Sequence, residues 1–410
     1  MTEPSGLTLA LVTAFPPGQR SLNEYGLHLA RSFAARPDVA RVIVLADRLS
    51  GPVRELELGP KVRVRRCWRF NSAGAGLSIA AALRAERADA VLFNLQTATF
   101  GDWEVPAALG LFAPALARLT GTPTGVLAHN LVDGIDLDAT QLKGQWLRQR
   151  LVQVGGAITT RALLWSGSLA VTLEGYRSLL AARYPGASVA VVPHGTFDTA
   201  GTTPLPSAAR PLRIVTMGKF GTYKRLETLL RAFEILRADG RFEGLELVIG
   251  GQDHPGTPGY MARIARQAAG TPGLRFAGYL PEEAIPAFFG SARASVFDYD
   301  ATTGSSGVLH QTASYGAVPV FPRIGDFVDV CRDEGLGGLN YDSGDADGMA
   351  RAIAEVLVDP DRADRIANAN RAASLDMPFS EVTSRHLALL RERMRDRAPR
   401  RDRGRALSAG

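Results

Sequence analysis

The stretch DATTGSSGVLHQTASYGAVPV, residues 300–320, decides the fold. An apolar run typical of a strand, residues 294–297, precedes it, and a turn of small, mostly hydroxyl-bearing residues spans 302–307. Apolar side chains then recur at helical spacing until Gly316, and Val318 opens another strand. Such a turn makes an anion site, because only small side chains let a phosphate approach the N–H groups of a helix N-terminus. The alternative is an ordinary strand-to-helix connection.

The rest of the chain alternates strands and helices in two series. The first has expected strands at 7–12, 42–46, 62–66, 90–95, 124–129, 169–172 and 189–192, with helices after Asn23, at 77–87, at 103–119 and after Glu174. The second has expected strands at 212–217, 245–249, 274–276 and 294–297, with helices at 224–237, 258–269 and 281–289. Strands separated by single helices predict an α/β fold of two doubly wound, Rossmann-like domains facing across a cleft. The first strand lacks the dinucleotide signature G-x-G-x-x-G.

The composition indicates the number of domains and the kind of protein. The chain has 410 residues, 46% of them hydrophobic, which is ample for two domains. Cys67 and Cys331 are too few for a disulfide framework or a zinc cluster, so we expect both to serve core packing. No apolar run approaches the ~18 residues that span a bilayer. The first residues lack a basic signal-peptide region, and we expect a cytoplasmic protein.

The net charge of +6 is concentrated at the C-terminus. Residues 391–405 hold eight arginines and three acidic residues, a net +5, which leaves about +1 for the rest. This balance argues against a nucleic-acid groove in the folded body. The basic tail, and the basic, Trp-bearing segment 139–165, could contact an anionic membrane. The alternatives are a solvated tail and an ordinary packed helix.

Polar residues follow several strands of the first series, where parallel sheets place their active sites. They include Gly18 and Asn23 after the first strand, Asn94 near the end of the fourth, and His129 directly after the fifth. Asn23 could also cap the helix that follows it. His129 is expected at the rim of the sheet, although a lone histidine is more often structural.

In the second series, Lys219 and Lys224 flank a glycine-bearing loop at the end of a strand. Two ammonium groups there could neutralise a diphosphate without a metal ion. Asp298 and Asp300 have the spacing of a carboxylate pair that binds Mn²⁺ or Mg²⁺. Because the lysines already supply positive charge, we expect no metal.

The segments MGKF at 217–220 and KRLETLLRAF at 224–233 resemble the donor-diphosphate motif of GT-B fold glycosyltransferases of glycosyltransferase family 4. VPHG at 192–195 resembles the family's entry to its interdomain linker, GAVPV at 316–320 its G-x-P-V signature, and His129 its acceptor-domain histidine. The resemblance covers nearly the whole chain.

The resemblance implies a domain division and a set of site residues. An acceptor-side domain would span 1–198 and a nucleotide-sugar domain 199–377, with a helix at 378–396 crossing back to the first domain and a basic, flexible tail at 397–410. Lys219, Lys224 and His129 would act in catalysis. The donor would contact Gly218, Gly251, Tyr279, Gly304, Ser305, Ser306, Gly307 and Gln311, and the acceptor or transferred sugar would contact Gly18, Asn23, Tyr25 and Asn94.

The chain departs from the family's pattern at its paired glutamates. The glutamate expected on the ribose maps to Gln311, and the one expected near the sugar maps to about Thr303. Gly18 is the obvious equivalent of the family's paired glycines in the first loop. We interpret the chain as a variant of the family, in which Asp300 could replace a missing carboxylate.

The resulting prediction is a metal-independent, retaining glycosyltransferase of polysaccharide biosynthesis with no cofactor. It would move a hexose from a nucleotide diphosphate sugar to a carbohydrate or lipid-linked acceptor. One alternative is a nucleotide-sugar epimerase of the same fold, which needs a carboxylate acid/base pair. The other is a binder of sugar nucleotides that has lost catalysis.

Overall fold

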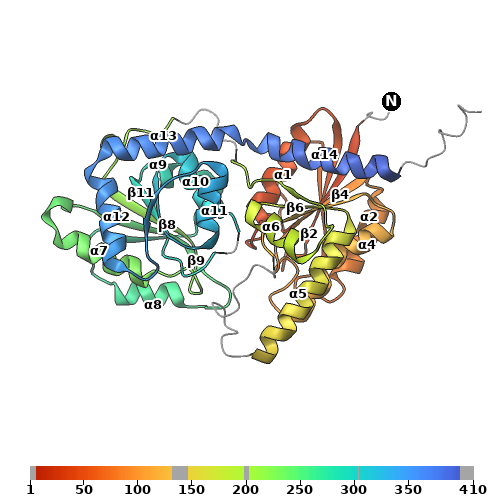
Figure 1. Cartoon of the computed structure of the whole chain (residues 1–410), viewed down its shortest axis with the longest axis horizontal. Helices are drawn as coiled ribbons and strands as arrows, with labels where there is room; N and C mark the ends of the chain where they lie inside the picture. The colour runs from red at the N-terminus through yellow and green to blue at the C-terminus, as the bar shows by residue number, and fades with distance from the viewer. Residues whose placement is uncertain (1–5, 132–145, 198–202, 303, 398–410) are drawn as a thin grey trace, which may run out of the picture.

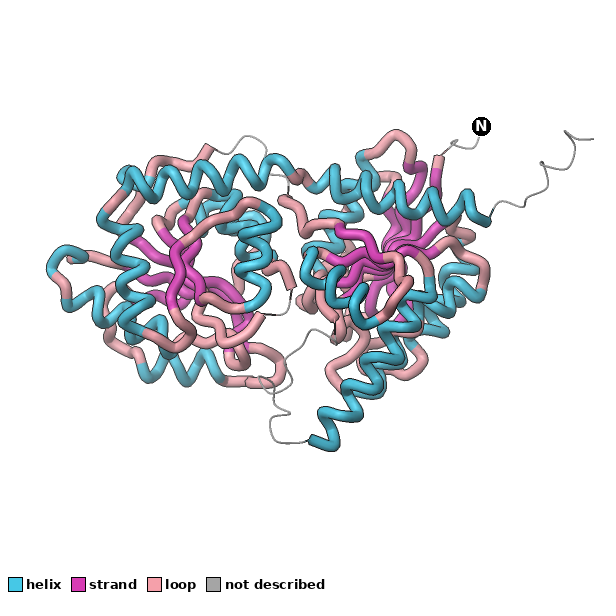
Figure 2. The backbone as a smooth tube through the Cα atoms, in the orientation of Figure 1, coloured by secondary structure: helices cyan, strands magenta, loops and turns pink. Residues whose placement is uncertain are grey.

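The computed structural model describes residues 6–131, 146–197, 203–302 and 304–397. They form two α/β halves side by side, with a long helical segment running along one edge of both (Figure 1). Helices surround the strands of each half (Figure 2). The predicted fold of two doubly wound domains is confirmed.

The first sheet has seven parallel strands in the order β3-β2-β1-β4-β5-β6-β7. Its strands are β1 (Leu7–Val12), β2 (Val39–Asp47), β3 (Val62–Trp68), β4 (Ala90–Leu95), β5 (Thr124–Ala128), β6 (Ser168–Val171) and β7 (Val189–Val191). Its helices are α1 (Asn23–Ala35), α2 (Ala75–Glu86), α3 (Glu104–Gly110), α4 (Ala113–Leu119), α5 (Trp146–Ser166) and α6 (Glu174–Arg183). The side chains of β4 are all buried, because helices cover both faces of the sheet.

The second sheet has six parallel strands in the order β10-β9-β8-β11-β12-β13. They are β8 (Arg213–Phe220), β9 (Glu246–Asp253), β10 (Leu274–Gly278), β11 (Ala294–Val296), β12 (Val318–Pro322) and β13 (Leu339–Tyr341). The helices are α7 (Glu227–Ala238), α8 (Tyr260–Gln267), α9 (Ile285–Gly290), α10 (Gly307–Tyr315), α11 (Gly325–Glu334), α12 (Ala346–Val358) and α13 (Pro360–Asp376), with short 3-10 turns η3 (Ser207–Ala209), η4 (Gly240–Phe242) and η5 (Glu282–Ala284). The strand order reverses between β1 and β4 and between β8 and β11, and ligands of such sheets bind at these reversal points.

Several elements differ from the sequence-based expectation. The single helix expected at 103–119 is two helices, because Pro114 in the first turn of α4 lacks an N–H and its ring would clash with the carbonyl of Gly110. The loop expected from Gly218 is strand as far as Phe220, where β8 pairs with β9. The short α11 and β13 had no clear periodicity and were not predicted.

The chain passes between the two domains twice, and the two passages lie together. The Thr196 N–H donates to the Met377 carbonyl at 2.9 Å, and Thr196 forms a parallel bridge with Pro378. Beyond this hinge, α14 (Phe379–Arg397) packs on the first domain, where Val382 and Leu390 are fully buried. The tail predicted from residue 397 lies almost wholly outside the described residues.

Candidate active site

Lys219 and Lys224 come together at the reversal point of the second sheet. Lys219 lies near the end of β8, and Lys224 follows in the loop before α7. The Lys219 ammonium donates to the carbonyl of Gln19, in the loop after β1 of the first domain, at 2.6 Å. Burial lowers the pKa of Lys219, the nearby Lys224 lowers it further, and Glu24 opposes both effects. The two ammonium groups therefore share one electrostatic environment, next to the loop that follows β1.

Aromatic rings surround the Lys224 side chain. Its ammonium lies 4.7 Å from the ring centre of Tyr299 and 5.8 Å from that of Tyr223. Burial acts against the charged form, but the two tyrosines outweigh it and the pKa of Lys224 is raised. Gly218 lies beneath, where an added Cβ would lie 3.4 Å from the Lys224 Cδ. Lys224 is thus held in place as a cation at neutral pH.

The turn from Thr302 to Gly307 follows β11 at the same reversal point, and Asp326 of α11 holds it. One Asp326 carboxylate oxygen accepts from the Gly304 N–H at 2.6 Å and from the Tyr176 hydroxyl of the first domain at 2.9 Å. The Asp326 N–H in turn donates to the Thr302 hydroxyl at 3.0 Å. Thr303, the position expected near the sugar, lies outside the described residues.

Ser305, Ser306 and Gly307 lead into α10. Ser306 has φ 53°, a left-handed conformation that is rare outside glycine, and its hydroxyl accepts from the Leu309 N–H at the helix start. Ser305 is 2% exposed, and its hydroxyl has no hydrogen-bond partner in the described part of the protein. Because buried hydroxyls are normally paired, this one is a candidate hydrogen-bond donor to a ligand.

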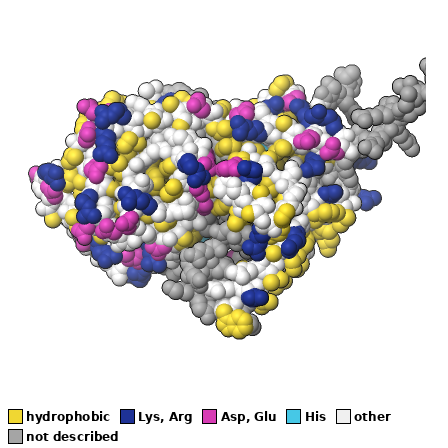
Figure 3. Space-filling model, in the orientation of Figure 1, with side chains coloured by type: hydrophobic (Ala, Val, Ile, Leu, Met, Phe, Trp, Pro, Cys, Tyr) yellow, Lys and Arg dark blue, Asp and Glu magenta, His cyan; other side chains and the backbone are white. Residues whose placement is uncertain are grey.

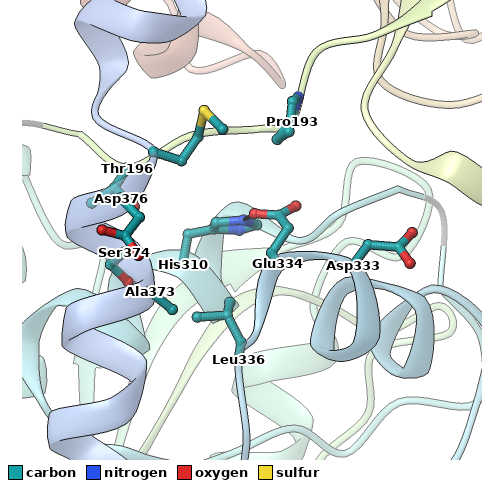
Figure 4. A pocket seen from close by; sticks show the side chains of 10 residues that line it. Pro193, Thr196, His310, Asp333, Glu334, Leu336, Ala373, Ser374 and Asp376 are labelled. Atoms are coloured by element: carbon teal, nitrogen blue, oxygen red, sulfur yellow. Dashed lines mark hydrogen bonds and ion pairs between the residues drawn. The ribbon is translucent and has the colours of Figure 1, made fainter.

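His310, one turn into α10, supports the turn from below. In Figure 4 its imidazole and the Glu334 carboxylate point toward each other within a hinge cavity of about 190 Å³. His310 Nε2 lies 2.8 Å from a Glu334 oxygen and Nδ1 lies 3.0 Å from the Ser306 carbonyl. Burial alone would lower the pKa of His310, but Glu334 raises it overall. When protonated, the imidazole donates to both oxygens, and its contact with the Ser306 carbonyl supports the turn.

His129 lies directly after β5, as expected, but it is buried at 6% exposure. Its Nε2 lies 2.7 Å from Asn94 Oδ1, while the Asn94 amide group donates to the Thr13 hydroxyl at 3.0 Å. This orientation makes Nε2 the protonated nitrogen and leaves Nδ1 as an acceptor. Burial, assisted by His386, lowers the pKa of His129 to about 3. The imidazole is neutral at physiological pH.

The turn and His129 meet across the domains. A Cβ added to Gly304 would lie 2.4 Å from the His129 carbonyl oxygen, and Gly304 has φ 108°. Only glycine fits both the conformation and the space. The structure therefore places the small turn against His129, and Lys224 forms a backbone bridge with Tyr299, just before that turn.

The predicted acceptor-side residues Tyr25 and Asn94 contact His129, but both are buried. Tyr25 is 3% exposed, and its hydroxyl donates to the His194 carbonyl at 2.9 Å, so it belongs to the hinge and is not open to an acceptor. Asn23 does not cap α1, whose N-cap is Leu22; its amide donates to the Gly18 carbonyl. Asn94 is fully buried behind His129.

The predicted donor residues line the second domain. Gly251 has φ 126°, and a Cβ there would lie 1.9 Å from the Gly218 carbonyl, which explains glycine at that position. Tyr279 is 47% exposed just after β10, and Gln311 is partly buried on α10, one turn after Gly307. All three residues belong to the same domain as the lysines, and none of them has a direct contact with a lysine side chain among the described interactions.

The pair Asp298 and Asp300 is not arranged as a metal site. One Asp298 oxygen accepts from the Thr228 and Leu229 N–H groups, at 2.9 and 3.0 Å, and so caps the start of α7. Asp300 pairs with Arg225 at 2.7 Å. No group of three or more potential metal ligands occurs within the described ranges. The two carboxylates therefore stabilise the polypeptide around Lys224.

Sequence reasoning missed Glu24 and Asp326. Burial raises the pKa of Glu24, which lies on α1 close enough to Lys219 to affect its charge, and near Glu282 of η5. His28, one turn later, pairs with Glu282 at 2.6 Å and joins the domains. Lys219 and Lys224, which the sequence did predict, have a further signal in the composition. The chain has only four lysines among its 47 basic residues, and two of them lie here, five residues apart.

Comparisons with known proteins find a matching domain in the second half of the chain and related folds for the whole chain. Residues 211–359 match the family described as Glycosyl transferases group 1. No match was found among curated protein sequences. The fold is similar to that of Anabaena Alr3699/HepE in complex with UDP and glucose, at TM-score 0.66 and 14% identity over 94% of this chain and 99% of that chain.

Two further solved structures share the fold. Sucrose-phosphate synthase from Thermosynechococcus elongatus aligns at TM-score 0.69 and 14% identity, over 94% of this chain and 98% of that chain. The α,α-trehalose-phosphate synthase (UDP-forming) from Burkholderia xenovorans, in complex with glucose-6-phosphate, aligns at 0.66 and 13%, over 94% and 100%. Residues 211–359 therefore form a glycosyltransferase domain, and the chain as a whole has the two-domain GT-B fold of these structures.

Proposed function

We propose that the protein transfers a hexose from a nucleotide diphosphate sugar to a carbohydrate or lipid-linked acceptor, with retention of configuration and without a metal ion. We also propose that it is a family 4 variant in which Gln311 replaces a glutamate. One observation carries the proposal: two lysines and a helix N-terminus share the reversal point of the second sheet, opposite a neutral histidine of the first domain.

The diphosphate would lie between the lysines and the turn. Lys224, charged and held between tyrosines, and Lys219, next to the loop that follows β1, supply two positive charges. The N–H groups of Ser305 to Gly307 and the unpartnered Ser305 hydroxyl supply donors at the start of α10. As the sugar–phosphate bond breaks, these groups stabilise the leaving diphosphate, which is the role that a metal ion has in other transferases.

The base and ribose would extend along the second domain, with the base bordered by Gly251 and Tyr279 and the ribose near Gln311. The Gln311 amide hydrogen-bonds a hydroxyl but adds no charge. Structural neighbours were solved with UDP and with UDP-glucose, which makes UDP-sugars the first donors to test here.

His129 is proposed to position the transferred sugar. Its Nδ1 accepts a hydrogen bond from a sugar hydroxyl, because Nε2 already donates to Asn94. With a pKa of about 3 it is a poor general base at neutral pH. An inverting transferase needs such a base to activate the acceptor, so the neutral His129 supports a retaining reaction.

The experiment has two stages. Calorimetry with UDP- and GDP-hexoses identifies the donor, and release of the nucleoside diphosphate with candidate acceptors, followed by NMR of the new glycosidic bond, identifies the product and its anomeric configuration. An α-linked product from an α-linked donor is expected. Free epimerised sugar nucleotide without acceptor would instead indicate an epimerase. Tight donor binding with no release for any acceptor class would indicate a binding protein.

A further inference from the structure

Helix α5 exposes four large apolar side chains on one side, and most of the side chains that it buries are small. Leu151, Val154, Ile158 and Trp165 are 68, 54, 50 and 47% exposed. At 100° per residue these four lie within an arc of roughly 60°. The buried positions of the same helix include Gly156, Thr159, Thr160, Leu163 and Ser166. Packing on the first domain does not account for this distribution, which is the reverse of that in an ordinary surface helix.

The apolar surface extends to the neighbouring helices. Packing joins α4 to both α2 and α5, and α3 also contacts α5. Of the 17 exposed large hydrophobic residues in the described part of the chain, nine lie between residues 103 and 165. Those outside α5 are Trp103, Val105, Leu109 and Leu119, and Trp146 opens α5. Figure 3 shows hydrophobic side chains gathered along α5, which slants away from the first sheet. We call this surface, formed by α3, α4 and α5, the α5 face.

On α4 and α5 the charges of the α5 face have one sign. Residues 113–119 and 146–166 contain four arginines and no acidic residue, whereas the exposed Asp102 and Glu104 lie at the start of α3. Arg150 and Arg161 are exposed and lie at the edge of the apolar arc, and the Arg118 guanidinium lies 4.5 Å from the Trp165 ring centre. Of the protein's four tryptophans, three belong to the α5 face, and the fourth, Trp68, is buried.

We propose that the α5 face docks on the surface of an anionic lipid bilayer. A stripe of Leu, Val, Ile and Trp flanked by arginines matches a bilayer interface, where apolar side chains enter the acyl boundary and arginines meet lipid phosphates. A protein partner of ordinary surface charge gives no reason for a segment without acidic residues. None of the described helices is both long and apolar enough to cross a bilayer, so the protein would lie on the membrane. This surface goes beyond the proposed transfer reaction and shares no residue with the donor site.

The test uses the full chain and vesicles of phosphatidylcholine, with or without phosphatidylglycerol. Binding is followed by sedimentation and by tryptophan fluorescence, with brominated lipid as a quencher. Binding to anionic vesicles, a blue shift and quenching are expected, and added salt is expected to weaken binding. The double variant Leu151→Ser/Ile158→Ser is expected to lose at least about tenfold in partitioning, and Arg150→Glu/Arg161→Glu a similar amount.

The matched control is Val358→Ser/Leu375→Ser, which removes two apolar side chains of 53 and 54% exposure from the second domain and is expected to bind vesicles like wild type. Donor binding should be unchanged in all three variants, which shows that they are folded. The proposal is wrong if the wild type does not bind anionic vesicles or binds neutral vesicles equally well. It is also wrong if the α5 variants bind anionic vesicles as strongly as the wild type. It is also wrong if the wild type is a dimer that Leu151→Ser/Ile158→Ser makes monomeric while vesicles remain unbound.

Discussion

Gly304 of the second domain lies against the backbone of His129 of the first, so closely that a Cβ on Gly304 would come within 2.4 Å of the His129 carbonyl oxygen. The contact joins the anion-binding turn to the residue proposed to hold the transferred sugar. It requires the domains to be close together, and it requires a glycine with a left-handed backbone.

Gly304→Ala is therefore expected to lower the transfer rate at least about tenfold, because the methyl group must push the domains apart or distort the turn. Backbone strain alone costs about 1–2 kcal/mol. Gly259→Ala is the control, since Gly259 also has positive φ but an added Cβ would meet nothing within 4 Å. Steady-state kinetics and thermal melting of both variants separate the contact from the strain, and equal rates for the two would contradict this account.

Ser305→Ala is expected to weaken donor binding about five- to tenfold with little change in stability, because the hydroxyl has no hydrogen-bond partner among the residues that the structure describes. The control Ser314→Ala removes a buried hydroxyl of α10 that donates to the His310 carbonyl at 2.7 Å. It should lower stability by about 1 kcal/mol and leave donor affinity unchanged. Calorimetry measures donor affinity and urea unfolding measures stability. If Ser305→Ala lowers stability but leaves donor affinity unchanged, Ser305 is not part of the donor site.

Asp298→Ala is expected to destabilise the protein by about 2 kcal/mol, because two N–H groups at the start of α7 lose their acceptor. Asp300→Ala breaks a partly exposed pair with Arg225 and should cost less than about 1 kcal/mol. Under the metal-independent proposal, EDTA leaves donor binding of the wild type unchanged. A large loss of affinity with EDTA, restored by Mg²⁺ or Mn²⁺, would contradict it.

Buried histidines predict acid sensitivity. The pKa of His386 is lowered to about 4 by burial, so between pH 6.5 and 4 the unfolded chain binds a proton there that the folded protein does not. The free energy of unfolding therefore decreases as the pH is lowered through this window, by up to about 1.4 kcal/mol per pH unit for this residue. His386→Leu should reduce that slope in urea unfolding between pH 7 and 5, and an unchanged slope would exclude the effect. His310, with its raised pKa, acts at higher pH, where its stabilising contribution is lost as pH rises through the folded pKa.

The sequence predicted the fold because the signals that carry it are local. Continuous apolar runs such as 90–95 predict buried strands, and the small residues at 302–307 predict a turn. The break at Pro114 was also local and was overlooked. The roles of Tyr25 and Asp298 could not be predicted, since each depends on a partner far away in the chain, the His194 carbonyl and the N–H groups of α7. The exposed apolar side of α5 could be recognised only from the burial of each of its residues in the structure.

The central claim is that Lys224 and Lys219 bind a nucleoside diphosphate at the reversal point of the second sheet. The direct test is calorimetry of UDP and GDP with wild type, Lys224→Ala and the control Arg266→Ala, which removes an exposed cation from α8 of the same domain. Loss of a charge-assisted hydrogen bond predicts about 10- to 100-fold weaker binding by Lys224→Ala, and wild-type affinity for Arg266→Ala. If folded Lys224→Ala protein binds the nucleotide as tightly as wild type, the account of the donor site is wrong.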